Sequence, residues 1–246
     1  MKLIQVKEIK GKIILKTGLH IGAGDTEMRI GGTDNTVIKH PHTLEPYIPG
    51  SSLKGKVRSL LELRSGLMLD TEGEPITAEI LKKLKKKREN ESEKSKIIED
   101  QIKEAEMILK LFGTSGADVE EAESFGPTRV SFSDCYIDDS WKKDAIEQNL
   151  PFTEIKPENT IDRIKGTAKN PRFTERVPAG VEFRFSISLK KMDGDDESLE
   201  DFLLLGLKLL QMDALGGNGS RGDGKVKFKF DDSEFQQKFN NINPFF

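Results

Sequence analysis

Alternation of apolar and polar residues predicts four β-strands along this chain. Apolar side chains recur from Leu3 to Leu15 and stop at the turn signal Thr17-Gly18. Residues 181–189 alternate strictly, which is the pattern of a half-buried strand. Two shorter stretches carry the same signal, so the predicted strands are residues 3–16, 130–137, 181–189 and 225–230.

Apolar residues spaced three and four positions apart predict three helices, at residues 51–64, 98–112 and 199–210. The first begins after the breaker Pro49-Gly50, where Ser51 and Ser52 supply N-cap signals. The charge-dense stretch from Leu81 to Lys96 precedes the second helix. We interpret it as the solvated or disordered front of a helical insertion, with a polybasic signal over Lys82 to Arg88 as the alternative.

The order of these elements predicts an α+β fold with a ferredoxin-like core. Without the insertions the order is strand, long loop, helix, strand, excursion, strand, helix, strand, which is the split βαβ pattern shared with RNA-recognition motifs. Helices would cover one face of an antiparallel sheet and leave the other free to bind. We expect one domain over residues 1–246, with a helical insertion at 70–115, an excursion at 152–180, a polar tail at 231–246 and loops over 22–49 and 141–157.

Composition excludes several classes of protein. Of the 246 residues 33% are charged, and no apolar run approaches the roughly 20 residues of a membrane span. The first residues lack the apolar core of a secretory signal, so we expect a cytoplasmic protein without a membrane partner. Cys135 is the single cysteine and there are three histidines, so we expect no disulfide, no structural zinc and no structural metal site.

Charge is distributed unevenly along the chain. The net charge is −3, which gives no overall reason to expect a polyanionic partner. However, Arg163, Lys165, Lys169 and Arg172 follow one another without an intervening acid, whereas residues 193–201 are almost purely acidic. A nucleic acid would therefore have to bind a local basic segment.

The glycine-rich segment Leu215–Gly224 contains a formal G-x-G-x-x-G pattern at Gly217, Gly219 and Gly222. A dinucleotide site needs this pattern after a strand and before a helix, and the predicted order is the reverse. A dinucleotide site is therefore excluded. Either the segment is a flexible loop, or its glycine N–H groups beside Arg221 allow a phosphate backbone to approach closely.

The start of the first predicted helix carries cations where the helix dipole disfavours them. Lys54, Lys56 and Arg58 follow Ser51 and Ser52 within the first turns. Free N–H groups, two hydroxyls and three cations together form a favourable phosphate site. The alternative is that these long side chains only cover the surface.

Seven motifs together resemble the RAMP superfamily, and their order and spacing are similar to the Csm-type backbone subunit of the type III-A CRISPR interference complex. This resemblance implies a modified RNA-recognition-motif core that stacks in several copies along a guide RNA, beside other subunits of the complex. It also implies cutting of the complementary target RNA at regular intervals. The motifs are Thr17–Gly22, Gly31–Asp34, Ile48–Lys56, Leu111–Ser115, Glu158–Arg163, Asn170–Arg172 and the glycine-rich segment.

The resemblance assigns roles to single residues. Asp34 matches the family's cleavage residue, where a carboxylate could ligate a divalent cation, Mg or Mn, or accept the proton of an attacking 2′-OH. An aspartate after two glycines can also be a simple turn former. His20 matches a histidine associated with RNA binding, although a histidine at a strand end can equally be packed. Ser51, Ser52 and Lys54 match the start of the guide-binding helix.

Residues 152–178 resemble the family's thumb, a projecting hairpin that wedges between bases. Ile161, Ile164 and Ala168 could pack against an unstacked base while the neighbouring cations neutralise phosphates. No aromatic stacking motif of an ordinary RNA-recognition motif is present, so we expect binding to backbone and shape instead of base identity. The predicted RNA-binding residues are His20, Ser51, Ser52, Lys54, Arg58, Arg163, Lys165, Lys169, Arg172, Gly217, Gly219 and Arg221.

Three functional hypotheses remain at this stage. The first is a target-cleaving endoribonuclease that is also a scaffold for the guide. The second is a purely RNA-binding scaffold subunit in which Asp34 is structural. The third, a guide-processing endonuclease acting as a monomer, is weaker because no His–Tyr–Lys cluster is visible for metal-free acid–base catalysis.

Overall fold

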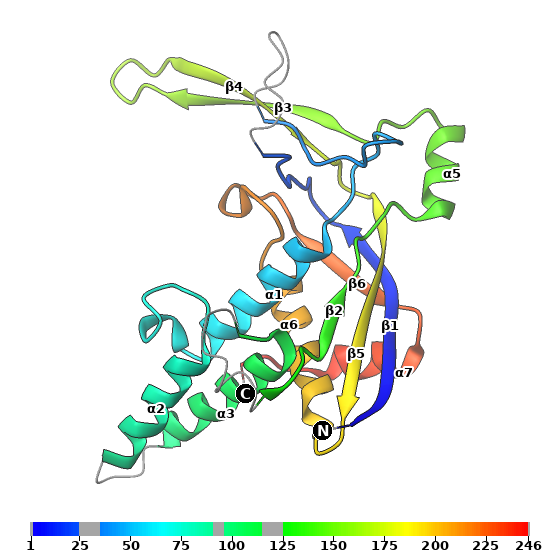
Figure 1. Cartoon of the computed structure of the whole chain (residues 1–246). Helices are drawn as coiled ribbons and strands as arrows, with labels where there is room; N and C mark the ends of the chain where they lie inside the picture. Colours follow the sequence, from blue (N-terminus) through cyan, green and yellow to red (C-terminus); the bar gives the residue numbers. More distant parts are fainter. Residues whose placement is uncertain (1, 25–34, 91–95, 115–124, 246) are drawn as a thin grey trace.

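The computed structural model describes residues 2–24, 35–90, 96–114 and 125–245, with Glu89 and Asn90 as backbone only. At its centre lies an antiparallel sheet with the strand order β2-β5-β1-β6 (Figure 1). With the first and third core strands in the middle, this is the ferredoxin-like arrangement, and the predicted α+β class is confirmed. The strands are β1 (Leu3–Leu15), β2 (Val130–Phe132), β5 (Glu182–Met192) and β6 (Val226–Phe230).

The pairing register of β1 and β5 places apolar side chains on one face of the sheet. Ile9 lies opposite Ile187, and Ile13 lies opposite Phe183. All four side chains are fully buried. Because successive side chains of a strand point to opposite faces, the other face carries polar residues, among them Lys10, Lys12, Arg184, Ser186, Lys227 and Lys229.

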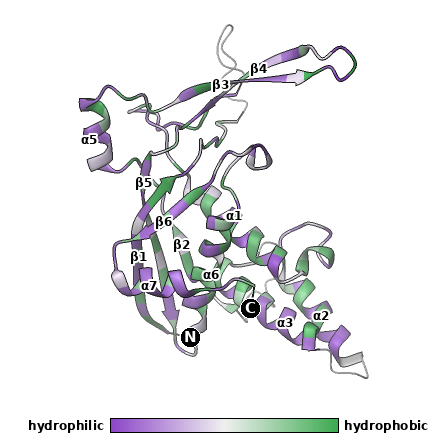
Figure 2. Ribbon diagram, turned by 180° about the vertical axis from the view of Figure 1, so that it is seen from behind, coloured by the Kyte–Doolittle hydropathy of each residue, from purple (hydrophilic) through white to green (hydrophobic). Residues whose placement is uncertain are grey.

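Helices α1 (Gly50–Arg64), α6 (Ser198–Met212) and α7 (Ser233–Asn241) pack on the apolar side of the sheet. In Figure 2 hydrophobic residues concentrate on α1 and α6, whereas α5 (Asp139–Glu147) and α7 are largely hydrophilic. Gly206 allows α6 to lie close to α1, because a Cβ there would be 2.7 Å from Val57 Cγ1. Within the described part of the chain, no helix is long and apolar enough to cross a bilayer.

The range 70–115 contains two helices, α2 (Ala78–Asn90) and α3 (Lys96–Phe112). The charge-dense stretch is therefore helical up to Asn90, and residues 91–95 lie outside the described ranges. Arg58 of α1 ties both ends of this insertion to the core. Its guanidinium donates to the carbonyl oxygens of Ile76 at 2.7 Å and Gly113 at 3.2 Å.

The excursion contains two paired strands, β3 (Glu154–Ile161) and β4 (Ala168–Arg176), which form a separate two-stranded sheet. Figure 1 shows this hairpin projecting from the core at the end opposite to α2 and α3. No helix of the described residues covers the β3-β4 hairpin, which exposes side chains on both faces.

Helix α5 occupies part of the 141–157 stretch that the sequence predicted as loop. Asp138 caps it by accepting the Trp141 N–H at 3.2 Å, and the Trp141 ring lies 6.2 Å from that of Phe152. Only Ala145 of this short helix is buried, so its apolar periodicity is too weak to be detected. The helix is stabilised by tertiary contacts, of Lys12 with Asp138 and of Phe152 with Trp141, which the local sequence pattern does not indicate.

Helix α7 lies within the segment 231–246 that was predicted as a polar tail. Asp232 caps it by accepting the Glu234 N–H at 2.7 Å. Phe235 and Phe239 pack against Phe230 of β6, with ring centroids 6.3 and 5.0 Å apart. Their spacing of four residues behind a capping aspartate was a helix signal in the sequence, and the prediction of a tail was wrong for this part.

The Asp138 cap also predicts how stability depends on pH. Burial opposes ionisation of this carboxyl, but hydrogen bonds from Ser140 and Lys12 outweigh it and lower its pKa to about 2. A depressed pKa in the folded state stabilises the fold above the unfolded pKa near 4. This stabilisation is lost as the pH falls toward 2.

We expect Asp138→Asn to lower the free energy of unfolding by about 1–2 kcal/mol at neutral pH, because the amide can still cap α5 but no longer pairs with Lys12. Urea denaturation of the purified chain at pH 7, 5, 4 and 3 measures this, and the difference from wild type should shrink below pH 4. Asp139→Asn, at an exposed position of the same turn, is the control and should stay within about 0.5 kcal/mol. An equal loss at pH 7 and pH 3 would contradict the charge-based explanation.

Candidate nucleic-acid interface

The tip of the β3-β4 hairpin is an ordered turn with exposed side chains. The Asp162 carboxylate accepts the N–H groups of Ile164 at 2.9 Å and Lys165 at 3.1 Å. Gly166 has a positive φ of 67°, which favours glycine. Ile164 is 96% exposed, so an apolar side chain is held at the tip without a partner in the core.

Four predicted cations lie together on this hairpin, at Arg163, Lys165, Lys169 and Arg172, and all four are exposed. Lys169 forms an ion pair with Asp162 at 2.5 Å and holds the pKa of that carboxyl below its usual value. No ion pair engages the other three within the described ranges. The hairpin therefore presents cations beside exposed apolar residues, which is the combination that single-stranded RNA binding uses.

The base of the hairpin is joined to the glycine-rich segment by a charge network. Arg176 bridges Glu154 and the buried Asp223, at 2.7 Å to each carboxylate. Lys156 lies 3.2 Å from Glu158 and 3.6 Å from Asp223. These contacts place Gly217, Gly219 and Arg221 beside the foot of the hairpin.

The glycine-rich segment has a defined backbone. Asn218 and Gly222 have φ angles of 61° and 92°, on either side of a short 3-10 turn at Gly219–Arg221. Gly224 cannot carry a side chain, because a Cβ there would lie 2.0 Å from the Leu215 oxygen. The Arg221 guanidinium is 3.3 Å from Glu158, so this side chain leans toward the hairpin.

His20 lies at the junction of three elements. Its Nδ1 is 2.7 Å from the Glu175 carbonyl oxygen of β4, and its own carbonyl accepts the Gly217 N–H at 2.8 Å. A carbonyl oxygen can only accept, so Nδ1 carries the proton in this geometry. His20 thus links the exit of β1 to β4 through its half-buried ring and to the glycine-rich segment through its carbonyl oxygen.

The start of α1 lies on the same half of the molecule as the hairpin base (Figure 1). Pro49 is its N-cap residue, without a side-chain cap, and the Gly50 N–H donates to Asp134 at 2.8 Å. Ser51 is exposed and Ser52 and Lys54 are half-buried, with no ion pair at Lys54 among the described residues. The N–H groups of Ser52 and Leu53 both donate to the Pro49 carbonyl oxygen, at 3.0 and 3.2 Å. What favours an anion here is the Lys54 cation, the two serine hydroxyls and the positive end of the helix dipole.

Arg58 and Lys56 point to other partners. The Arg58 guanidinium is only 14% exposed and pairs with Glu62 at 2.8 Å, in addition to the two carbonyls of the insertion. Lys56 pairs with Asp213 at 2.7 Å. The Arg58–Glu62 spacing of four residues was visible in the sequence, but Asp213 and the two carbonyl groups that engage these cations come from distant parts of the chain.

Asp34, together with the rest of the Gly31–Asp34 motif, lies outside the described residues. The next residue, Asn35, is described, and its carbonyl accepts the Glu175 N–H at 2.9 Å. Glu175, Lys39, Arg176 and Asp223 were not singled out from the sequence, because their roles depend on contacts between segments more than 40 residues apart.

In the described part of the chain, no group of three or more His, Cys, Asp or Glu side chains is arranged to hold a metal ion. Cys135 is buried, and burial raises the pKa of its thiol to about 12.

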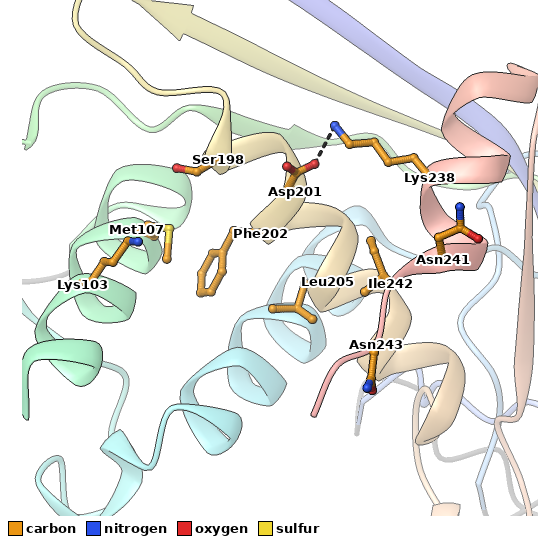
Figure 3. Close-up of a pocket in the computed structure, with 10 residues that line it drawn as sticks. All are labelled: Lys103, Met107, Ser198, Asp201, Phe202, Leu205, Lys238, Asn241, Ile242 and Asn243. Atoms are coloured by element: carbon orange, nitrogen blue, oxygen red, sulfur yellow. Dashed lines mark ion pairs between the residues drawn. The ribbon is translucent and has the colours of Figure 1, made fainter. Parts of the chain in front are cut away.

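A separate groove of about 560 Å³ lies between α3, α6 and the segment that follows α7 (Figure 3). Phe202 and Leu205 of α6 line it, and an ion pair of 2.5 Å between Lys238 and Asp201 crosses its rim. None of the predicted RNA-binding residues lines this groove. It is therefore not part of the candidate interface.

Comparison with known proteins shows the family of this chain. The RAMP superfamily model matches residues 12–227. A protein from Methanothermobacter thermautotrophicus named "CRISPR system Cms endoribonuclease Csm3" is 37% identical, over 90% of this chain and 82% of its own length. Proteins of the same name from Enterococcus italicus and Streptococcus thermophilus are 35% and 37% identical, over 91% and 90% of this chain and 89% and 86% of their own lengths.

Solved structures give the same result. The chain is similar to one in the crystal structure of a Csm3-Csm4 subcomplex of the type III-A CRISPR-Cas interference complex, with a TM-score of 0.52 and 25% identity over 96% of this chain and 85% of the other. A chain of a type III-B Cmr-beta complex bound to cognate target RNA shares the fold, with a TM-score of 0.53 and 16% identity over 92% and 59% of the two chains. The chain belongs to the RAMP superfamily and, within it, to the Csm3 family.

Proposed function

We propose that this chain is the guide-RNA-binding backbone subunit of a type III-A CRISPR effector, stacks in multiple copies along the guide and cleaves the complementary target RNA at regular intervals. The observation that carries the proposal is the 35–37% identity, over nine-tenths of the chain, to proteins named endoribonuclease Csm3. Its partners would be guide RNA, target RNA, further copies of itself and other subunits of the complex, working in the cytoplasm.

The described elements support two phosphate contacts with the guide. Ser51, Ser52 and Lys54 would bind a phosphate at the start of α1, where helix N–H groups favour an anion. The glycine-rich segment would let a phosphate backbone approach beside Arg221. We leave Arg58 out of this set, because its guanidinium is engaged by Glu62 and two carbonyl groups.

The β3-β4 hairpin would act as the thumb. Ile164 at its exposed tip would pack against an unstacked base, while Arg163, Lys165 and Arg172 neutralise the adjacent phosphates. None of these contacts requires a particular base, which suits a protein that carries guides of any sequence.

Asp34 would serve the cleavage of the target. Its carboxylate would either accept the proton of the attacking 2′-OH or bind a divalent cation, Mg or Mn, whose remaining ligands come from RNA phosphates and water. Its chain neighbour Asn35 is hydrogen-bonded to β4. This bond holds the residue after Asp34 against the strand that carries the Lys169 and Arg172 cations, which supports a role for Asp34 near the bound RNA.

The Asp34→Ala variant tests the proposal in the assembled complex. With a labelled complementary RNA, we expect evenly spaced products from wild type and a loss of cutting of about 100-fold or more in the variant, with target binding retained. Asp193→Ala, at an exposed aspartate after β5, is the matched control and should cut normally. Addition of a chelator, followed by Mg or Mn, separates metal assistance from proton transfer. Unchanged cutting by Asp34→Ala would leave the chain as a non-catalytic scaffold.

The phosphate contacts predict a change in salt dependence. Lys54→Ala and Arg172→Ala should each lower the slope of log affinity against log salt concentration by about 0.7–1, because each removes one phosphate contact. Fluorescence anisotropy of single-stranded RNA with the purified chain measures this slope. Lys87→Ala on α2 should leave it unchanged. A similar decrease for Lys87→Ala would show that the effect is not specific to the interface.

Substitution of Gly55 by a large residue should raise the stability of the fold and weaken RNA binding. Gly55 lies on the exposed face of α1 next to Ser51, with no atom within 4 Å of an added Cβ. Gly55→Leu should raise the free energy of unfolding by up to about 1 kcal/mol, because glycine is a poor helix former. Gly55→Leu should also weaken RNA binding, because a large side chain there would obstruct the approach of the RNA backbone to the start of α1. Gly55→Ala should show the gain in stability with little loss of binding, and tighter RNA binding by Gly55→Leu would contradict the proposed contact.

A further inference from the structure

Glu175, near the end of β4, is bonded at once to residues 35–39 and to His20. Only 8% of the residue is exposed. Its carboxylate accepts the Val37 N–H at 3.0 Å and the Lys39 ammonium at 2.6 Å. Its backbone N–H donates to the Asn35 carbonyl at 2.9 Å, and its carbonyl oxygen lies 2.7 Å from His20 Nδ1. A single residue therefore fixes the segment that directly follows Asp34.

The partner segment is one side of a short ladder. The Ala23 N–H donates to the Thr36 oxygen at 3.1 Å, and the Ile38 N–H donates to the Ile21 oxygen at 2.8 Å. Residues 25–34 connect the two sides of this ladder. The contacts that Glu175 makes with Asn35, Val37 and Lys39 hold one end of that connection, and the ladder bonds tie the other end, at residues 21–23, to it.

We propose that Glu175 is a positioning residue for target cleavage, which holds the segment behind Asp34 in a fixed place relative to the hairpin that binds RNA. This inference rests on the proposed function. Glu175 and the cations of the hairpin lie on the same strand, so its bonds to residues 35–39 couple the RNA-binding strand directly to the stem of the cleavage loop. His20 extends the coupling to the glycine-rich segment through its carbonyl bond to the Gly217 N–H.

The charge state of Glu175 agrees with a positioning role. Burial raises the pKa of this carboxyl, but bonds from Lys39, the Val37 N–H and Thr153 outweigh burial and bring it below its usual value. The group stays ionised at neutral pH, and its oxygens are occupied by donors of the protein. Glu175 therefore holds other groups and does not exchange a proton with RNA.

The first experiment compares Glu175→Gln with wild type in the complete guide-loaded complex. The amide keeps the size of the side chain but turns an N–H group toward the Lys39 ammonium or the Val37 N–H. We expect the single-turnover cleavage rate to fall about 10- to 100-fold, because small displacements of a reacting group have effects of this size. Affinity for a target carrying 2′-deoxy nucleotides at the cleavage positions should change less than about twofold.

Two further variants separate positioning from general damage to the hairpin. Glu154→Gln removes a carboxylate that pairs with Arg176 at the same hairpin base but contacts none of residues 35–39, and it should cut at the wild-type rate. Lys39→Gln added to Glu175→Gln restores a donor–acceptor pair between the two side chains, and it should recover part of the lost rate. Hydrogen exchange of residues 35–39 should be faster in Glu175→Gln and normal in Glu154→Gln.

These experiments distinguish a failure of the positioning role of Glu175 from a failure of the proposed function. Loss of cutting in Asp34→Ala with a wild-type rate in Glu175→Gln would overturn the positioning role alone, whereas normal cutting in Asp34→Ala would overturn the proposed function as well. An equal decrease in Glu175→Gln and Glu154→Gln would also overturn the positioning role. Should Glu175→Gln fail to assemble, Lys39→Gln alone gives the same test, with a smaller decrease in rate expected and an unchanged rate as the contrary result.

Discussion

The pairing of β1 with β5 is the constraint on which the rest of this structure depends. Ile9 and Ile13 face Ile187 and Phe183 across the two central strands, and a slip by one residue would turn these apolar side chains to the open face. Burial of the apolar face under α1 and α6 therefore holds the register. The same register sets the exit of β1, where Leu19 and Val177 exchange two backbone hydrogen bonds of 2.8 and 2.9 Å.

Buried carboxylates hold the segments of the candidate interface together near the exit of β1. Glu175 and Asp223 are 8% and 1% exposed, and both bind cations at the base of the β3-β4 hairpin. Arg163, Lys165 and Arg172 farther out have no such partner within the described ranges. A chain with net charge −3 can in this way present a basic hairpin, because its acids neutralise the cations that hold the fold and leave those at the tip free.

Two cations of α1 have different roles because the groups around them differ. Arg58 and Lys54 are both half-buried and lie one turn apart on α1. Arg58 meets two carbonyl oxygens where the insertion leaves and rejoins the core, and a guanidinium can donate to several acceptors at once. Lys54 lies near the start of the helix, where the helix dipole is positive and no carboxylate of the described residues pairs with the ammonium, and this favours an external anion.

The sequence by itself determined the α+β class, the central strands, α1 and α6, because their apolar periodicities are long and each reports burial of one face. It also determined that residues 163–172 are basic, and of the four cations there only Lys169 has an ion-pair partner, Asp162, within the described ranges. Only the tertiary structure decided that α5 is a helix, that Arg58 is internal and that Glu175 joins β4 to residues 35–39. Each of these depends on partners distant in the chain, such as Lys12 for Asp138 and Gly113 for Arg58. Such contacts leave no periodic trace in the sequence, because hydrogen bonds and ion pairs are set by positions in space that only the packed sheet and helices define.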